Sequence, residues 1–140
     1  MFGKVTPLEL AIVLLVVLLG GMAAHQLGYA LRIETVWHAV LYLALAPLLE
    51  EYVFRSQFQQ WIADRFRAPL FALLLSSLTF AAFHIPWIGW VAVGMLVPGL
   101  MLGLYWLRFR NLWLNVALHS VMNAVLALAT WGLNIYFLTK

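Results

Sequence analysis

Residues 47–55 read Pro-Leu-Leu-Glu-Glu-Tyr-Val-Phe-Arg, so that Glu50, Glu51 and Arg55 lie inside an otherwise apolar segment. An ionised group near the centre of a membrane-spanning helix costs about 2.5 to 3.5 kcal/mol on translocon-based scales. Such residues are therefore usually paired, turned towards a cavity and functional. The segment predicts a membrane helix that carries a functional site.

Helical geometry gives the two glutamates different surroundings. Glu51 and Arg55 are four residues apart, in the order that favours an ion pair on one helix face. Glu50 lies about 100° around the helix and has no cation four residues on, so its carboxylate is available to take a proton from water. We also expect Pro47 to remove the hydrogen bond to the Leu43 carbonyl and to kink the helix beside the site. The alternative interpretation is a buried, purely structural ion-pair network.

The composition indicates a membrane protein. Of the 140 residues, 66% are hydrophobic and only 9% are charged, whereas about 25% of residues are charged in soluble domains. We predict one all-α domain over residues 1–140, a polytopic membrane helical bundle with its site in an intramembrane cavity. The absence of cysteine excludes disulfides, thiol nucleophiles and Cys-ligated zinc. The small, scattered net charge of +3 does not suggest a nucleic-acid partner.

Five apolar stretches predict about five transmembrane helices. They cover approximately residues 8–24, 35–61, 69–85, 88–107 and 112–131. The first stretch also resembles a cleavable signal peptide, but we expect an uncleaved anchor. In the fourth stretch, Gly99 and Gly103 have the spacing that allows another helix to approach closely.

Charged and aromatic residues predict the orientation of these helices. An internal N-terminus would place most basic residues in the cytoplasm (Lys4, Arg65, Arg67, Arg108 and Arg110) and only Arg32 and Lys140 outside. The seven tryptophans fall near the ends of the predicted helices, where an interfacial aromatic belt is expected; they are Trp37, Trp61, Trp87, Trp90, Trp106, Trp113 and Trp131. We expect His25 and His38 to lie at the membrane interface without a catalytic role.

Polar residues on other predicted helices can meet Glu50. His84 lies in the third stretch, and His119 and Asn123 lie four residues apart on one face of the fifth. At about 1.5 Å per residue, these residues lie at overlapping depths. One carboxylate, two histidines and an asparagine suit amide hydrolysis by water. In this hypothesis Glu50 and His84 activate the water, while His119 and Asn123 donate hydrogen bonds to the oxyanion.

Three sequence motifs carry a resemblance to a known family. They occur in order on successive hydrophobic segments and are Glu50-Glu51-xxx-Arg55, Phe80-xxx-His84 and His119-xxx-Asn123. Together they resemble the signature motifs of the CPBP family, whose members include CAAX prenyl endopeptidases, bacteriocin-processing proteins and other glutamic-type intramembrane proteases. The resemblance covers approximately residues 40–125, and the chain has little beyond these core helices.

The resemblance implies a role for each motif residue. Glu50 matches the catalytic glutamate, His84 the histidine that helps to activate water, and His119 with Asn123 the oxyanion pair. Glu51 and Arg55 match positions that support the site, and Phe80 matches an aromatic residue that shapes the histidine or the substrate.

The function implied by the resemblance is that of a glutamic-type intramembrane endopeptidase without metal or cofactor. Its partners would be the lipid bilayer and a membrane-associated protein or peptide substrate, cut during maturation, leader removal or processing of a C-terminal sorting signal. We expect a multi-pass protein of a bacterial cytoplasmic membrane. The sequence does not indicate the oligomeric state or which substrate is cut.

Four alternative functions stay open at this point. Ser76, Ser77 or Ser120 would be the nucleophile of a serine mechanism, although serines in membrane helices more often bond to backbone or to neighbouring helices. A zinc hydrolase would use Glu50, His84 and His119 as ligands, but no His-Glu-xx-His element supports it. A non-catalytic peptide-binding or immunity-type protein would keep the same motifs. A proton-linked carrier would use the same intramembrane Glu and His, but the sequence shows no inverted repeat.

Overall fold

The computed structural model describes residues 4–138, with side chains described for residues 4–131. Within this range the chain is helical and contains no strand. Four stretches are long and apolar enough to cross a membrane, namely Pro7–Gln26, Val36–Phe66, Pro69–Phe109 and Leu112–Trp131. The predicted class, a helical membrane bundle, is confirmed. Lys140, which the orientation argument placed outside, lies beyond the described residues.

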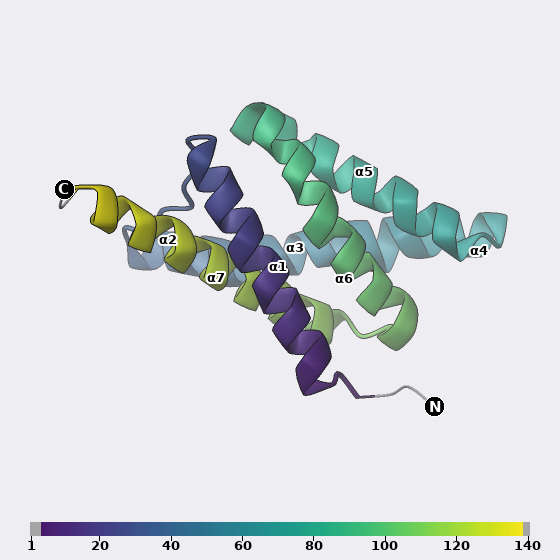
Figure 1. The fold of residues 1–140 in the computed structure, drawn as a ribbon. Helices are drawn as coiled ribbons and strands as arrows, with labels where there is room; N and C mark the ends of the chain where they lie inside the picture. Colours follow the sequence, from purple (N-terminus) through teal and green to yellow (C-terminus); the bar gives the residue numbers. More distant parts are fainter. Residues whose placement is uncertain (1–3, 139–140) are drawn as a thin grey trace.

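The first stretch is helix α1 (Pro7–Gln26), which starts with a capping box. The Thr6 hydroxyl accepts from the Glu9 N–H, the Glu9 carboxylate accepts from the Thr6 N–H, and Pro7 occupies the first turn. This pairing satisfies backbone donors that a helix start leaves free. Helix α1 lies across α7 (Leu112–Leu138) (Figure 1). Gly21 permits this contact, because a Cβ there would lie 3.1 Å from the Leu126 side chain.

The second stretch is one long helix with two wider turns. It runs through α2 (Val36–Val40), η1 (Leu41–Leu45), α3 (Ala46–Glu50), η2 (Glu51–Gln59) and α4 (Gln60–Phe66). Segments η1 and η2 are π-helical, so their N–H groups bond five residues back rather than four. The uniform α-helical register assumed from the sequence is therefore wrong on both sides of Glu50. Short π-helical segments within α-helices are frequent at functional sites, and both π segments here flank the candidate site.

The third stretch folds back on itself as a helical hairpin of α5 (Pro69–Ile88) and α6 (Leu96–Phe109), joined by the 3₁₀ segment η3 (Gly89–Met95) (Figure 1). The third and fourth helices predicted from the sequence are therefore the two arms of one continuous helical stretch. The close approach predicted for Gly99 and Gly103 is confirmed. A Cβ on Gly99 would lie 3.4 Å from the Ser77 Cα, and a Cβ on Gly103 would lie 2.4 Å from the Leu73 side chain.

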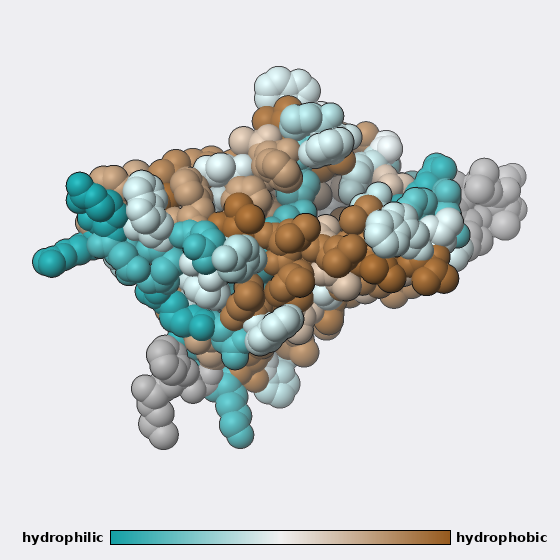
Figure 2. All heavy atoms as spheres, turned by 180° about the vertical axis from the view of Figure 1, so that it is seen from behind, coloured by the Kyte–Doolittle hydropathy of each residue, from teal (hydrophilic) through white to brown (hydrophobic). Residues whose placement is uncertain are grey.

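Apolar contacts between helices form the core, and apolar side chains also cover much of the surface. One core cluster joins α1, α6 and α7 through Val13, Leu102, Leu118 and Met122. Figure 2 shows hydrophobic residues over much of one face and hydrophilic residues gathered at the end where α4 meets α5. Six of the seven tryptophans are exposed, as an interfacial belt requires, but Trp106 is buried. Its indole donates to the Gln60 side chain at 3.3 Å, because α6 packs against the long helix there.

Candidate functional site

Glu50 lies between two imidazole rings. It ends α3, and its Oε2 is 3.9 Å from Nε2 of His84 on α5 and 3.7 Å from Nε2 of His119 on α7. These distances exceed those of direct hydrogen bonds but permit electrostatic interaction. The Glu50 and His84 side chains are 18% and 19% exposed, so the cluster is accessible from outside the protein. The structure thus brings together three of the residues predicted from the sequence.

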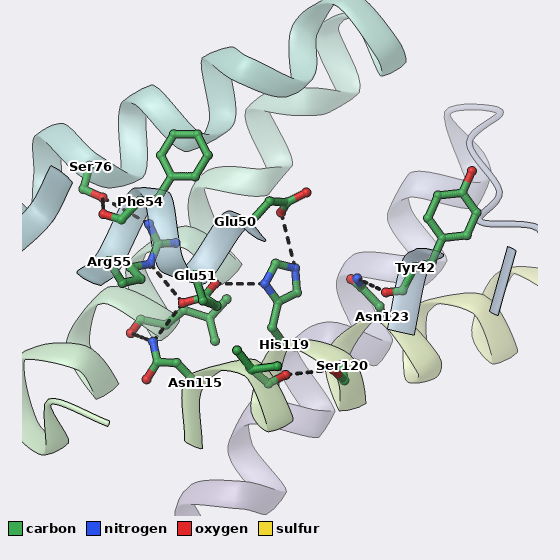
Figure 3. A network of polar contacts seen from close by, with 12 residues as sticks. Tyr42, Glu50, Glu51, Phe54, Arg55, Ser76, Asn115, His119, Ser120 and Asn123 are labelled. Carbon is green, nitrogen blue, oxygen red and sulfur yellow. Dashed lines mark hydrogen bonds and ion pairs between the residues drawn. The ribbon is translucent and has the colours of Figure 1, made fainter. Parts of the chain in front are cut away.

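Glu51 is enclosed by hydrogen-bonding partners. Its side chain is fully buried, and its Oε2 accepts from Nδ2 of Asn115 at 2.9 Å and lies 3.6 Å from Nε of Arg55. Its Oε1 is 2.9 Å from Nδ1 of His119 (Figure 3). The predicted pairing of Glu51 with Arg55 is therefore present. Because Glu51 also holds His119, the buried network orients the ring that faces Glu50.

Arg55 connects this network to α5. It is fully buried, its Nη1 donates to the Ser76 hydroxyl at 3.1 Å, and that hydroxyl donates to the Phe54 carbonyl at 2.8 Å. The guanidinium also lies 4.9 Å from the centre of the Phe80 ring, within the range of a cation–π contact. Ser76 is thus committed to structural bonds, which argues against its role as a nucleophile.

Phe80 and His84 are fixed to each other by the geometry of α5. Nδ1 of His84 lies 2.8 Å from the Phe80 carbonyl. A carbonyl only accepts, so Nδ1 donates in this bond and Nε2 is the nitrogen that faces Glu50. The Phe80 ring lies 4.7 Å from the His84 ring and 6.0 Å from the His119 ring. Phe80 therefore forms an apolar wall against both histidines.

Asn123 engages a different part of the long helix. Its Nδ2 donates to the Tyr42 carbonyl at 2.9 Å, and Figure 3 shows this bond apart from the contacts between Glu50 and His119. The oxyanion role expected for Asn123 stays a prediction.

Two serines besides Ser76 were candidate nucleophiles. Ser120 donates to the Val116 carbonyl of its own helix at 2.8 Å. The Ser77 hydroxyl is buried and has no hydrogen-bond partner among the described residues.

Sequence reasoning did not find Asn115. This side chain is fully buried and donates from Nδ2 both to Glu51 and, at 2.8 Å, to the Leu102 carbonyl. The available signal was spacing, since Asn115, His119 and Asn123 follow one another at intervals of four and share a face of α7.

Within residues 4–131, no group of three His, Asp or Glu side chains is arranged to hold a metal ion.

Comparison with known proteins identifies one family. A family model described as type II CAAX prenyl endopeptidase Rce1-like matches residues 32–125, which include every residue of the polar cluster. No curated protein and no solved structure matches the chain.

Proposed function

Because the chain belongs to the Rce1-like family of type II CAAX prenyl endopeptidases, we propose that it is a glutamic-type intramembrane endopeptidase. Its substrate would be a membrane-associated protein or peptide. The observation that carries this proposal is the position of the Glu50 carboxylate, 3.7 and 3.9 Å from the Nε2 atoms of two histidines. A water molecule bound among these three groups would lie next to a base and next to a hydrogen-bond donor or acceptor on each side.

In the proposed reaction, the Glu50 carboxylate takes a proton from water as the water oxygen attacks the carbonyl carbon of the scissile peptide bond. A neutral His84 protonated at Nδ1 would use its Nε2 lone pair to accept a hydrogen bond from the second O–H of the water, and this bond would orient the nucleophile. The proton held by Glu50 then passes to the leaving nitrogen as the C–N bond breaks. One water is consumed, and the products are a carboxyl terminus and an amino terminus.

His119 would stabilise the oxyanion. Its Nδ1 contacts Glu51, so its Nε2 is the nitrogen that faces the reacting groups. In the doubly protonated ring both nitrogens donate, and Nε2 would then donate to the oxygen that becomes negative. Loss of one such donor typically costs about 10² to 10³ in rate. No side chain needs to form a covalent intermediate.

The test is a comparison of protein termini in the membrane and secreted fractions of cells that contain wild-type protein or Glu50→Gln. Glu34→Gln is the matched control, because the Glu34 side chain is 63% exposed and pairs on the surface with Arg32. We expect a specific set of new termini in wild type and in the control, and the loss of this set in Glu50→Gln. Identical termini in all three, at equal protein abundance, would contradict the proposal and favour a peptide-binding or carrier function.

A further inference from the structure

The Tyr42 carbonyl lacks the backbone donors that a regular helix would give it. In an α-helical register it would accept from the N–H of Ala46, but that N–H bonds to Leu41, five residues back. In the π register of η1 the donor would be residue 47, which is proline and has no N–H. The carbonyl released by Pro47 is therefore that of Tyr42, and not that of Leu43 as the α-helical register had predicted.

Asn123 supplies the missing donor from another helix. Its amide nitrogen lies 2.9 Å from the Tyr42 oxygen, within the range of a normal hydrogen bond. Inside a bilayer an unpaired carbonyl is costly, so the bond fixes η1 against α7. Asn123 lies one turn beyond His119 on the same face of α7, and Glu50 follows Pro47 by three residues.

We propose that Asn123 replaces the N–H that Pro47 lacks and so holds Glu50 in place opposite His119. In this role Asn123 is a positioning residue that acts through the Tyr42 backbone, rather than a donor to the oxyanion. The bond itself is independent of the reaction, whereas its effect on cleavage rests on the proposed function.

A double-mutant cycle tests this role, because Pro47→Ala returns an N–H to the position that could bond to Tyr42. The full-length protein is purified in detergent as wild type, Asn123→Ala, Pro47→Ala and the double variant. For each, we measure thermal unfolding and the cleavage of a peptide that carries a cut site identified from the comparison of termini. If Asn123→Ala gives too little folded protein, Asn123→Ser takes its place in the same cycle.

We expect Asn123→Ala to lower the unfolding midpoint by roughly 3 to 6 °C and to slow cleavage by a factor on the order of 10². The double variant should regain most of both losses. Pro86→Ala combined with Asn123→Ala is the control and should regain neither, because Pro86 is exposed and belongs to another helix, α5.

Two results would overturn the proposal. A double variant whose midpoint equals the sum of the two single effects would show that Asn123 does not substitute for the missing N–H. A restored midpoint without restored cleavage would show that Asn123 acts on the reacting groups themselves. The thermal measurement needs no substrate, so it tests the bond even if the protein proves not to be a protease.

Discussion

At the residue scale, the two adjacent glutamates differ in what surrounds them rather than in their chemistry. The Glu50 side chain is 18% exposed and faces two imidazoles, whereas Glu51 is fully enclosed by Arg55, Asn115 and His119. A group that takes part in hydrolysis must be reached by water and substrate, and a group that orients others must be held still. This difference in exposure supports the catalytic role proposed for Glu50 and the supporting role proposed for Glu51.

Exchanging each glutamate for glutamine separates these tasks. Glu50→Gln is nearly isosteric and removes only the base, so we expect folded protein that does not cleave. Glu51→Gln leaves Arg55 buried without its anion, and breaking a buried ion pair costs about 3 to 5 kcal/mol. Its folded yield, measured by size-exclusion chromatography in detergent, should fall sharply. The reverse pattern would show that the two roles are assigned the wrong way round.

Asn115 links the buried Glu51 to the backbone of α6. Asn115→Ala removes one hydrogen bond to Glu51 and leaves the Leu102 carbonyl without this donor, so we expect a loss of about 1 to 3 kcal/mol of stability. Ser120→Ala is the control, since the Ser120 hydroxyl bonds, among the described residues, to a carbonyl of its own helix and to no other group. Denaturant titration of both variants in detergent measures the difference. Equal stability of the two variants would show that the hydrogen bonds of Asn115 do not stabilise the folded protein.

At the element scale, the helices could be predicted from the sequence but the turns within them could not. Apolar length and the turn residues Arg67, Pro69 and Arg110 locate the helix ends, because proline favours a first turn and basic residues gather at membrane edges. The π turns of η1 and η2 have no such signal, since they depend on which carbonyls neighbouring helices satisfy. The contact of Asn123 with Tyr42 was therefore not predicted, although the sequence singles out Asn123 as a motif residue.

Helix α6 packs closely against α5 at Gly103. A methyl group at Gly103 would lie 2.4 Å from the Leu73 side chain and 3.0 Å from Oε1 of Gln59. The Gln59 side chain is itself held in place, because its Nε2 donates to the Gly103 carbonyl at 3.0 Å. Overpacking typically costs about 1 to 3 kcal/mol. Gly103→Ala should therefore unfold at a lower temperature, while Gly20→Ala, with open space around its Cβ, should not. Equal midpoints would show that α6 can move away.

At the scale of the whole molecule, the Glu9 side chain pairs with Arg108 and so joins the start of α1 to the end of α6. Both ends then lie on the same side of the membrane, as the distribution of basic residues predicts. The sequence could predict this arrangement because hydropathy and charge act over whole helices. It could not predict how the helices pack around Glu51, since that depends on side-chain contacts between segments far apart in the chain.

Cysteine labelling tests which side faces the cytoplasm, and the natural chain contains no cysteine that would interfere. Asp64→Cys and Glu34→Cys replace exposed acidic residues, which have little influence on orientation. A membrane-impermeant maleimide should label residue 34 in intact cells and residue 64 only after permeabilisation. The opposite labelling would reverse the predicted orientation.

We propose that Glu50 activates water without a metal ion. The most direct measurement is the cleavage rate of a peptide that carries an identified cut site, by purified protein in liposomes after treatment with a zinc chelator. Wild type should keep its rate after chelation, and Glu50→Gln should be slower by roughly 10² to 10⁴. Loss of the wild-type rate on chelation, with recovery when zinc is returned, would contradict this mechanism, as would cleavage by Glu50→Gln at the wild-type rate.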